Sequence, residues 1–104
     1  MMQVCAEMKK LRKLLDKKRI AWIDKSDDFE KRNPEFWIVR THFEYKGKKW
    51  SAINGFGTYG GWNGANFPRM EEKDNMGLIE LMAMNEGEPK GWLTAEDVIK
   101  EIEK

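Results

Sequence analysis

One stretch of the chain alternates so regularly that it favours a single kind of structure. Residues 36–45 are β-branched, aromatic and polar in turn, and residues 48–54 resume the alternation after Lys46-Gly47. Two such runs joined by two residues, one of them a glycine that accepts a positive φ, are typical of a β-hairpin. The pattern therefore predicts strands over Phe36–Tyr45 and Lys48–Asn54.

The side-chain pairs that the predicted register creates show whether this hairpin is consistent. A two-residue turn pairs Phe43 with Trp50 and Glu44 with Lys49, which is an aromatic pair on one face and an opposite-charge pair on the other. A slip by one residue would mix the two sets. One face then carries Trp37, Val39, Thr41, Phe43, Tyr45, Trp50 and Ala52, and the other carries Arg40, His42, Glu44, Lys49 and Ser51.

Helical periodicity marks both ends of the chain. Near the N-terminus, apolar residues recur at spacings of three and four, at Val4, Met8, Leu11 and Leu15. Near the C-terminus, Thr94 precedes an apolar stripe and has Asp97 three residues later, an approximate capping box. Each pattern predicts an amphipathic helix.

The remaining elements follow from shorter signals. Residues 20–23 are apolar and predict an edge strand, and Asn75 could cap a short helix over Met76–Met84, ended by Asn85, Gly87 and Pro89. The predicted fold class is α+β, with helices on one face of a small antiparallel sheet of about three strands, in the order αβββαα. At 104 residues, we expect a single domain over 1–104.

Composition excludes several classes of protein. A single cysteine, Cys5, allows no intramolecular disulfide and fits a reducing compartment. No apolar run reaches the length of a signal peptide or a membrane span, so we expect a cytoplasmic protein without a membrane partner.

The net charge is +1, but its distribution along the chain is uneven. Residues 1–26 hold eight Lys/Arg against three Asp/Glu, and residues 71–104 hold four Lys/Arg against ten Asp/Glu. Either the terminal helices attract each other, within the fold or between protomers, or the basic helix meets an anionic partner.

The segment from Asn54 to Phe67 is unusual because five glycines at positions 55–64 alternate with aromatic residues. Glycines let backbone N–H groups approach an anion closely, and aromatic rings supply stacking surfaces for a flat group. Together they suit a nucleotide-like ligand, although neither a Walker A loop nor a dinucleotide fingerprint is present. Two alternatives stay open: a packed loop, and a loop that contacts a protein.

The candidate site residues come from this segment and from the polar hairpin face. Histidine and cysteine occur once each, far apart in sequence, so they make no transition-metal site, and we expect no cofactor and no catalytic residue. A Cys5–His42 nucleophile–base pair is the one enzymatic alternative. The predicted ligand-binding residues are Arg40, His42, Asn54, Phe56, Thr58, Tyr59, Trp62, Asn63 and Arg69. Binding of a long nucleic acid is disfavoured by the near-neutral total charge and the acidic C-terminal third.

Three runs carry a resemblance to a known group of proteins. The runs Asn54-Gly-Phe-Gly-Thr-Tyr-Gly-Gly61, Gly77-Leu-Ile-Glu-Leu-Met82 and Gly91-Trp-Leu-Thr-Ala-Glu-Asp-Val98 follow a short basic helix. In this order they resemble small uncharacterised accessory proteins encoded by bacteriophages and prophages. The resemblance implies a role in the host cytoplasm, in host interaction or counter-defence, and assigns no function to any residue.

These observations predict a non-enzymatic phage-type accessory protein. Its primary ligand would be a small nucleotide-derived anion held in the Gly/aromatic segment, as in a sponge that sequesters a signalling nucleotide. The alternative is an interaction module of anti-defence or anti-CRISPR type that inhibits a host protein through its charged helices and exposed aromatic residues. A homo-oligomer fits either, because small binders often build sites across two-fold interfaces.

Overall fold

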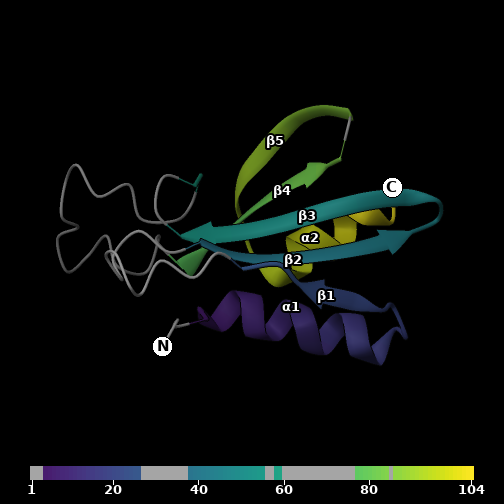
Figure 1. Ribbon diagram of the computed structural model, residues 1–104, viewed down its shortest axis with the longest axis horizontal. Coiled ribbons are helices and arrows are strands. Elements are labelled where there is room, and N and C mark those ends of the chain that lie inside the picture. Colours follow the sequence, from purple (N-terminus) through teal and green to yellow (C-terminus); the bar gives the residue numbers. More distant parts are fainter. Residues whose placement is uncertain (1–3, 27–37, 56–57, 60–76, 85) are drawn as a thin grey trace, which may run out of the picture.

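The structure is a computed structural model that describes residues 4–26, 38–55, 58–59, 77–84 and 86–104. These residues form an α+β fold, in which two helices cover one face of a five-stranded antiparallel sheet (Figure 1). The strands follow one another across the sheet in chain order, β1-β2-β3-β4-β5. The elements are α1 (Ala6–Lys17), β1 (Trp22–Asp24), β2 (Ile38–Tyr45), β3 (Lys48–Gly55), β4 (Ile79–Ala83), β5 (Glu86–Leu93) and α2 (Ala95–Ile102).

The central hairpin has the predicted register. Phe43 pairs with Trp50 and Glu44 with Lys49, and the turn places Gly47 at a φ of 80°. The face predicted to be apolar is the buried one, and it includes Thr41 with no exposed surface. The predicted first strand began at Phe36, and its first two residues lie outside the described part of the chain.

The predicted helix over Met76–Met84 is wrong, because residues 79–83 form strand β4 and residues 86–93 return as β5. The apolar residues 78, 79, 81 and 82 fit a helical face, but Ile79 and Leu81 also alternate as a strand requires. Pairing with β3 decides between the two and buries both side chains. Pro89 lies in β5, the last strand in the sheet order, where a missing N–H is tolerated. The sheet therefore has five strands rather than three, and the predicted cap at Asn75 falls outside the described residues.

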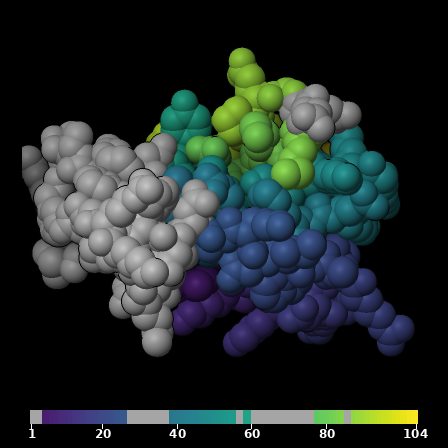
Figure 2. All heavy atoms as spheres, viewed as in Figure 1, coloured from purple at the N-terminus to yellow at the C-terminus, as the bar shows by residue number. Residues whose placement is uncertain are grey.

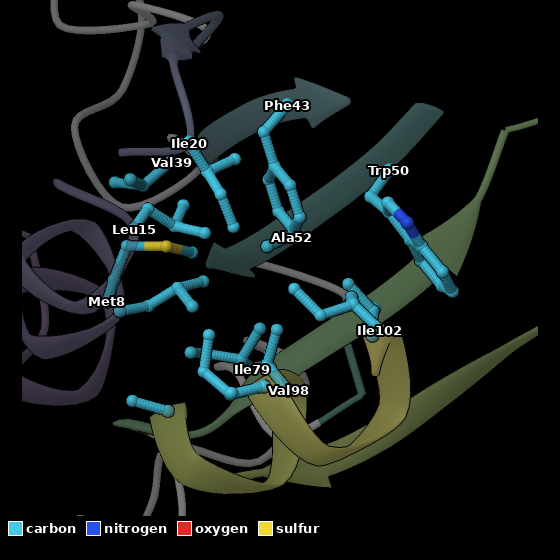
Figure 3. Packing of buried hydrophobic residues seen from close by; sticks show 14 residues of the cluster. Met8, Leu15, Ile20, Val39, Phe43, Trp50, Ala52, Ile79, Val98 and Ile102 are labelled. Atoms are coloured by element: carbon cyan, nitrogen blue, oxygen red, sulfur yellow. The ribbon is translucent and has the colours of Figure 1, made fainter. Parts of the chain in front are cut away.

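Both terminal helices are confirmed. Helix α1 buries Met8, Leu11 and Leu15, and the thiol of Cys5 accepts the Met8 N–H at its N-terminus (3.4 Å). Helix α2 begins after Thr94, whose side chain completes a reciprocal capping box with Asp97. In Figure 3 the apolar side chains of both helices converge on the same face of the sheet. The core cluster comprises Met8, Leu11, Leu15, Ile20, Val39, Phe43, Trp50, Ala52, Ile79, Leu81, Ala95, Val98, Ile99 and Ile102.

Opposite charges on the two helices meet within the fold. Lys10 of α1 forms an ion pair with Glu96 of α2, and Lys18 lies 3.6 Å from Glu103. The carboxylate of Glu7 accepts the backbone N–H of Ala95 at 2.8 Å. Exposed pairs contribute little free energy, so their effect is mainly to align α1 with α2. This favours mutual attraction of the terminal helices as the explanation of the uneven charge distribution.

Arg12 ties α1 to the sheet. Its Nε donates to the buried hydroxyl of Thr41 at 2.8 Å, and its guanidinium lies 4.7 Å from the centre of the Trp22 ring. It also lies 3.5 Å from a carboxylate oxygen of Asp24. One of the basic residues predicted to be available to an anionic partner is therefore a structural contact between helix and sheet edge.

Candidate functional site

The candidate site lies on the sheet face opposite the helices, which we call the open face. Figure 2 shows this face, with α2 hidden behind the sheet. Strand pairing arranges its side chains in rows. One row runs Arg40–Ile53–Glu80 across β2, β3 and β4, and the next runs Ile23–His42–Ser51–Met82 from β1 to β4. No helix in the described residues covers these rows.

A group of cationic and titratable side chains occupies the β1–β2 side of the open face. Arg40 and His42 alternate with the buried residues of β2, and the backbone N–H of Lys25 donates to the Arg40 carbonyl at 3.0 Å. Partial burial lowers the pKa of His42, and the positive charges of Arg40 and Lys25 lower it further. An anion placed here would be attracted by two fixed cations and would favour protonation of the imidazole.

A stacked aromatic pair lies at the other side of the open face. The rings of Tyr59 and Trp92 are 5.6 Å apart at an angle of 21°, yet the residues remain 51% and 60% exposed. The backbone N–H of Tyr59 donates to the Glu80 carboxylate at 2.8 Å, and the N–H of Trp92 donates to the Tyr59 carbonyl at 3.2 Å. These bonds fix the pair beside the row that contains Glu80.

Two backbone features make this pair possible. A Cβ atom on Gly91 would lie only 2.2 Å from the Cβ of Tyr59, so glycine is required for the approach. Trp92 has a φ of 54°, an uncommon conformation for a bulky residue, in a strand whose register shifts against β4. Backbone strain of this kind is concentrated at functional sites. The bulged strand thus presents a large aromatic ring at the surface.

The aromatic pair and the cations are separated by a distance that a small ligand can span. Arg40 and Glu80 flank Ile53 on neighbouring strands. With strands spaced by roughly 4.8 Å, the two side chains leave the sheet about 10 Å apart. Trp92 on β5 lies one strand spacing beyond Glu80, so about 14 Å separates it from Arg40, a span that suits an extended nucleotide derivative.

The other predicted site residues have different positions. Asn54 is buried and donates from its amide to the Leu78 carbonyl at 2.7 Å. Thr58 is buried too, and its hydroxyl accepts the Gly55 N–H and donates to the Gly55 carbonyl. Both connect the start of the Gly/aromatic segment to the sheet, so their contacts are structural. Phe56, Trp62, Asn63 and Arg69 lie outside the described residues.

The structure does not bring Cys5 and His42 together. Cys5 packs against the core on the helix side of the sheet, whereas His42 belongs to the open face. Burial also raises the pKa of the Cys5 thiol, which disfavours the nucleophilic thiolate. In the described part of the chain, no three His, Cys, Asp or Glu side chains are grouped so that they could hold a metal ion.

Trp92, Glu80 and Lys25 belong to the site, but the sequence prediction missed them. The signal for Trp92 was the glycine immediately before a tryptophan in an otherwise charged stretch. This glycine–tryptophan pattern indicates a surface aromatic residue only if residues 86–93 form a strand, which the sequence patterns did not predict.

Comparisons with known proteins add no assignment, since no protein-family model, curated protein or solved structure matches the chain. Among the described residues, no helix is both long and apolar enough to cross a lipid bilayer.

Proposed function

We propose that this chain is a non-enzymatic binding protein of the phage accessory type, which holds a small nucleotide-derived anion on the open face. The observation that carries the proposal is the exposed Tyr59–Trp92 stack, in which Trp92 has a strained backbone conformation and lies three strand spacings from Arg40. Counter-defence by sequestering a signalling nucleotide in the host cytoplasm is the use that fits such a site.

Each part of the ligand has a matching surface. A base or similar flat group stacks on the exposed side of the aromatic pair, a contact worth about 1–3 kcal/mol. Its phosphate then lies toward Lys25 and Arg40, with His42 as a neighbour that can donate a hydrogen bond.

Titration with a panel of nucleotides tests the proposal. The panel contains cyclic mononucleotides, cyclic dinucleotides and ADP-ribose derivatives, and the readouts are thermal unfolding and calorimetry. A ligand at a hundredfold excess over its Kd should stabilise the fold by about 2.7 kcal/mol. A panel in which no member shifts the unfolding temperature would refute nucleotide binding.

Substitution of Trp92 locates the site once a member of the panel binds. Trp92→Ala removes the stacking surface and should weaken binding by about 5- to 150-fold, the equivalent of 1–3 kcal/mol. Trp92→Phe keeps an aromatic ring and is the matched control, with a smaller loss. Equal affinities for the two variants would place the ligand elsewhere.

A second candidate is the protein-interaction module. The described residues with large exposed hydrophobic side chains are Ile23, Tyr59, Met82 and Trp92, and all four lie on the open face or beside it. An apolar surface on one side of a small protein suits a protein partner. On this candidate, Ile23→Asp abolishes capture of a host protein while the nucleotide titrations stay blank. Retained capture would exclude the open face as the contact surface.

A further inference from the structure

The middle row of the open face is complementary to itself. Arg40 lies on β2, Ile53 on β3 and Glu80 on β4, so a cation and an anion flank an apolar residue at equal strand spacings. Lys25, bonded to the Arg40 carbonyl, extends the cationic end. Tyr59 and Trp92 extend the anionic end, since Tyr59 is bonded to Glu80. From one side to the other, the row reads cation, cation, isoleucine, carboxylate, aromatic pair.

We propose that two copies of this chain pack face to face through the open face, about a two-fold axis that runs parallel to β3 above Ile53. Rotation by half a turn about this axis reverses the order of the strands, so β2 of one copy lies over β4 of the second. Each row of side chains then faces the same row of the second copy. Arg40 of one copy then faces Glu80 of the second copy, and Glu80 faces Arg40, while the two Ile53 side chains meet at the axis. The interface is isologous and closes as a dimer.

The adjacent rows are compatible with the same axis. His42 faces Met82 of the second copy, and the two Ser51 side chains face each other. Ile23 lies toward β5 of the second copy. Two exposed apolar side chains, Ile23 at 59% and Met82 at 38%, become covered. Toward the hairpin turn, the two Lys49 side chains face each other near the axis, and the carboxylate of the cross-strand partner Glu44 in each copy offsets this like-charge contact. Twisted sheets pack in this way with their strands within about 30° of each other.

The ends of the row meet across the margins of the dimer. Lys25 of one copy faces the Tyr59–Trp92 pair of the second copy, an arrangement that suits a cation over an aromatic face. The dimer does not depend on the ligand proposed above, because every contact in it joins protein to protein. It covers Arg40 and places Lys25 of the second copy over each aromatic pair, so the dimer and a ligand bound as proposed above compete for the open face.

Charge reversal tests the arrangement through complementation. Arg40→Glu leaves two carboxylates in the row of each chain, and Glu80→Arg leaves two cations, so either variant alone repels a second copy of itself. We expect wild type to sediment at twice its 12.3 kDa and each variant to sediment as a monomer. An equimolar mixture of the two variants pairs every cation with a carboxylate and should restore the dimer. The double variant in one chain should do so as well.

Controls separate this result from damage to the fold. Lys13→Glu and Glu103→Arg make the same charge changes at exposed positions on α1 and at the C-terminal end of α2, on the helix side of the sheet, and both should leave the dimer intact. Circular dichroism melts of the single variants exclude unfolding, and recovery of the dimer on mixing is itself evidence that both are folded. A monomeric wild type at millimolar concentration would overturn the proposal. Single variants that dimerise like wild type, or a mixture that stays monomeric, would overturn it equally.

Discussion

Gly91 supports a quantitative prediction about how the aromatic pair is held. In Gly91→Ala the new methyl group would lie 2.2 Å from the Cβ of Tyr59 and 3.1 Å from its carbonyl oxygen, so the segment that carries Tyr59 must move away. The movement breaks the stack with Trp92, worth about 0.5–1.5 kcal/mol, and the bond to the Glu80 carboxylate, worth about 1.5–3 kcal/mol when fully formed.

The net cost of Gly91→Ala is smaller than the sum of these contacts. The carboxylate bond is exposed to solvent, and replacing glycine reduces the entropy of the unfolded chain by about 0.4–1 kcal/mol. We therefore expect a loss of about 1–3 kcal/mol in the free energy of unfolding. Urea denaturation followed by far-UV circular dichroism measures this loss, and near-UV dichroism should report the lost aromatic stack.

Two further variants make this prediction sharp. Gly77→Ala is the matched control, because its new methyl group would lie at an ordinary 3.8 Å from Cys5, and it should change stability by less than about 0.5 kcal/mol. Tyr59→Gly removes the Cβ atom that is in the way, so Gly91→Ala should cost little in that background. If Gly91→Ala is as stable as Gly77→Ala, or costs the same in the Tyr59→Gly background, the close approach does not hold the pair.

Three other substitutions test the described contacts. Thr94→Ala removes the capping box of α2 and should lower the free energy of unfolding by about 1 kcal/mol in urea, whereas Thr94→Ser should retain most of it. Arg12→Met keeps the apolar stem but loses the bond to buried Thr41, so we expect a loss of about 1.5–3 kcal/mol, and a neutral result would contradict the anchoring role. Because the pKa of His42 is lower in the folded state than in the unfolded one, the unfolded chain binds more protons between the two values. Stability should rise with pH up to about 6.5, and His42→Gln should flatten this rise in melts recorded from pH 5 to 7.

Local patterns predicted the parts of the fold whose partners are near in sequence. The hairpin register followed from two residues between alternating runs, and the C-terminal helix from Thr94 and Asp97. The strand at 79–83 depends instead on β3, which lies more than twenty residues earlier in the chain. A short apolar run carries no information about such a partner, and helical spacing was then an equally good fit.

The candidate site was only partly predictable for the same reason. Arg40 and His42 were assigned correctly to the polar hairpin face, because that face follows from the register alone. Tyr59 was a candidate through composition, but its partner Trp92 lies on β5, a strand that the sequence patterns did not predict. Glu80 was missed with it, since a glutamate in a predicted helix gives no sign that it accepts a backbone N–H from residue 59.

The bond between Glu7 and Ala95 has a consequence for how the chain is made. Its two residues are 88 positions apart, and the helices they join share one core. During synthesis, α1 leaves the ribosome first and has no α2 to pack against until nearly all of the described chain has been translated. The apolar side chains of Met8, Leu11 and Leu15 therefore lack one of their packing partners, α2, for most of translation. The many lysines on the other faces of α1 keep that waiting segment hydrated, so the charge that later aligns the two helices also protects the nascent chain from aggregation.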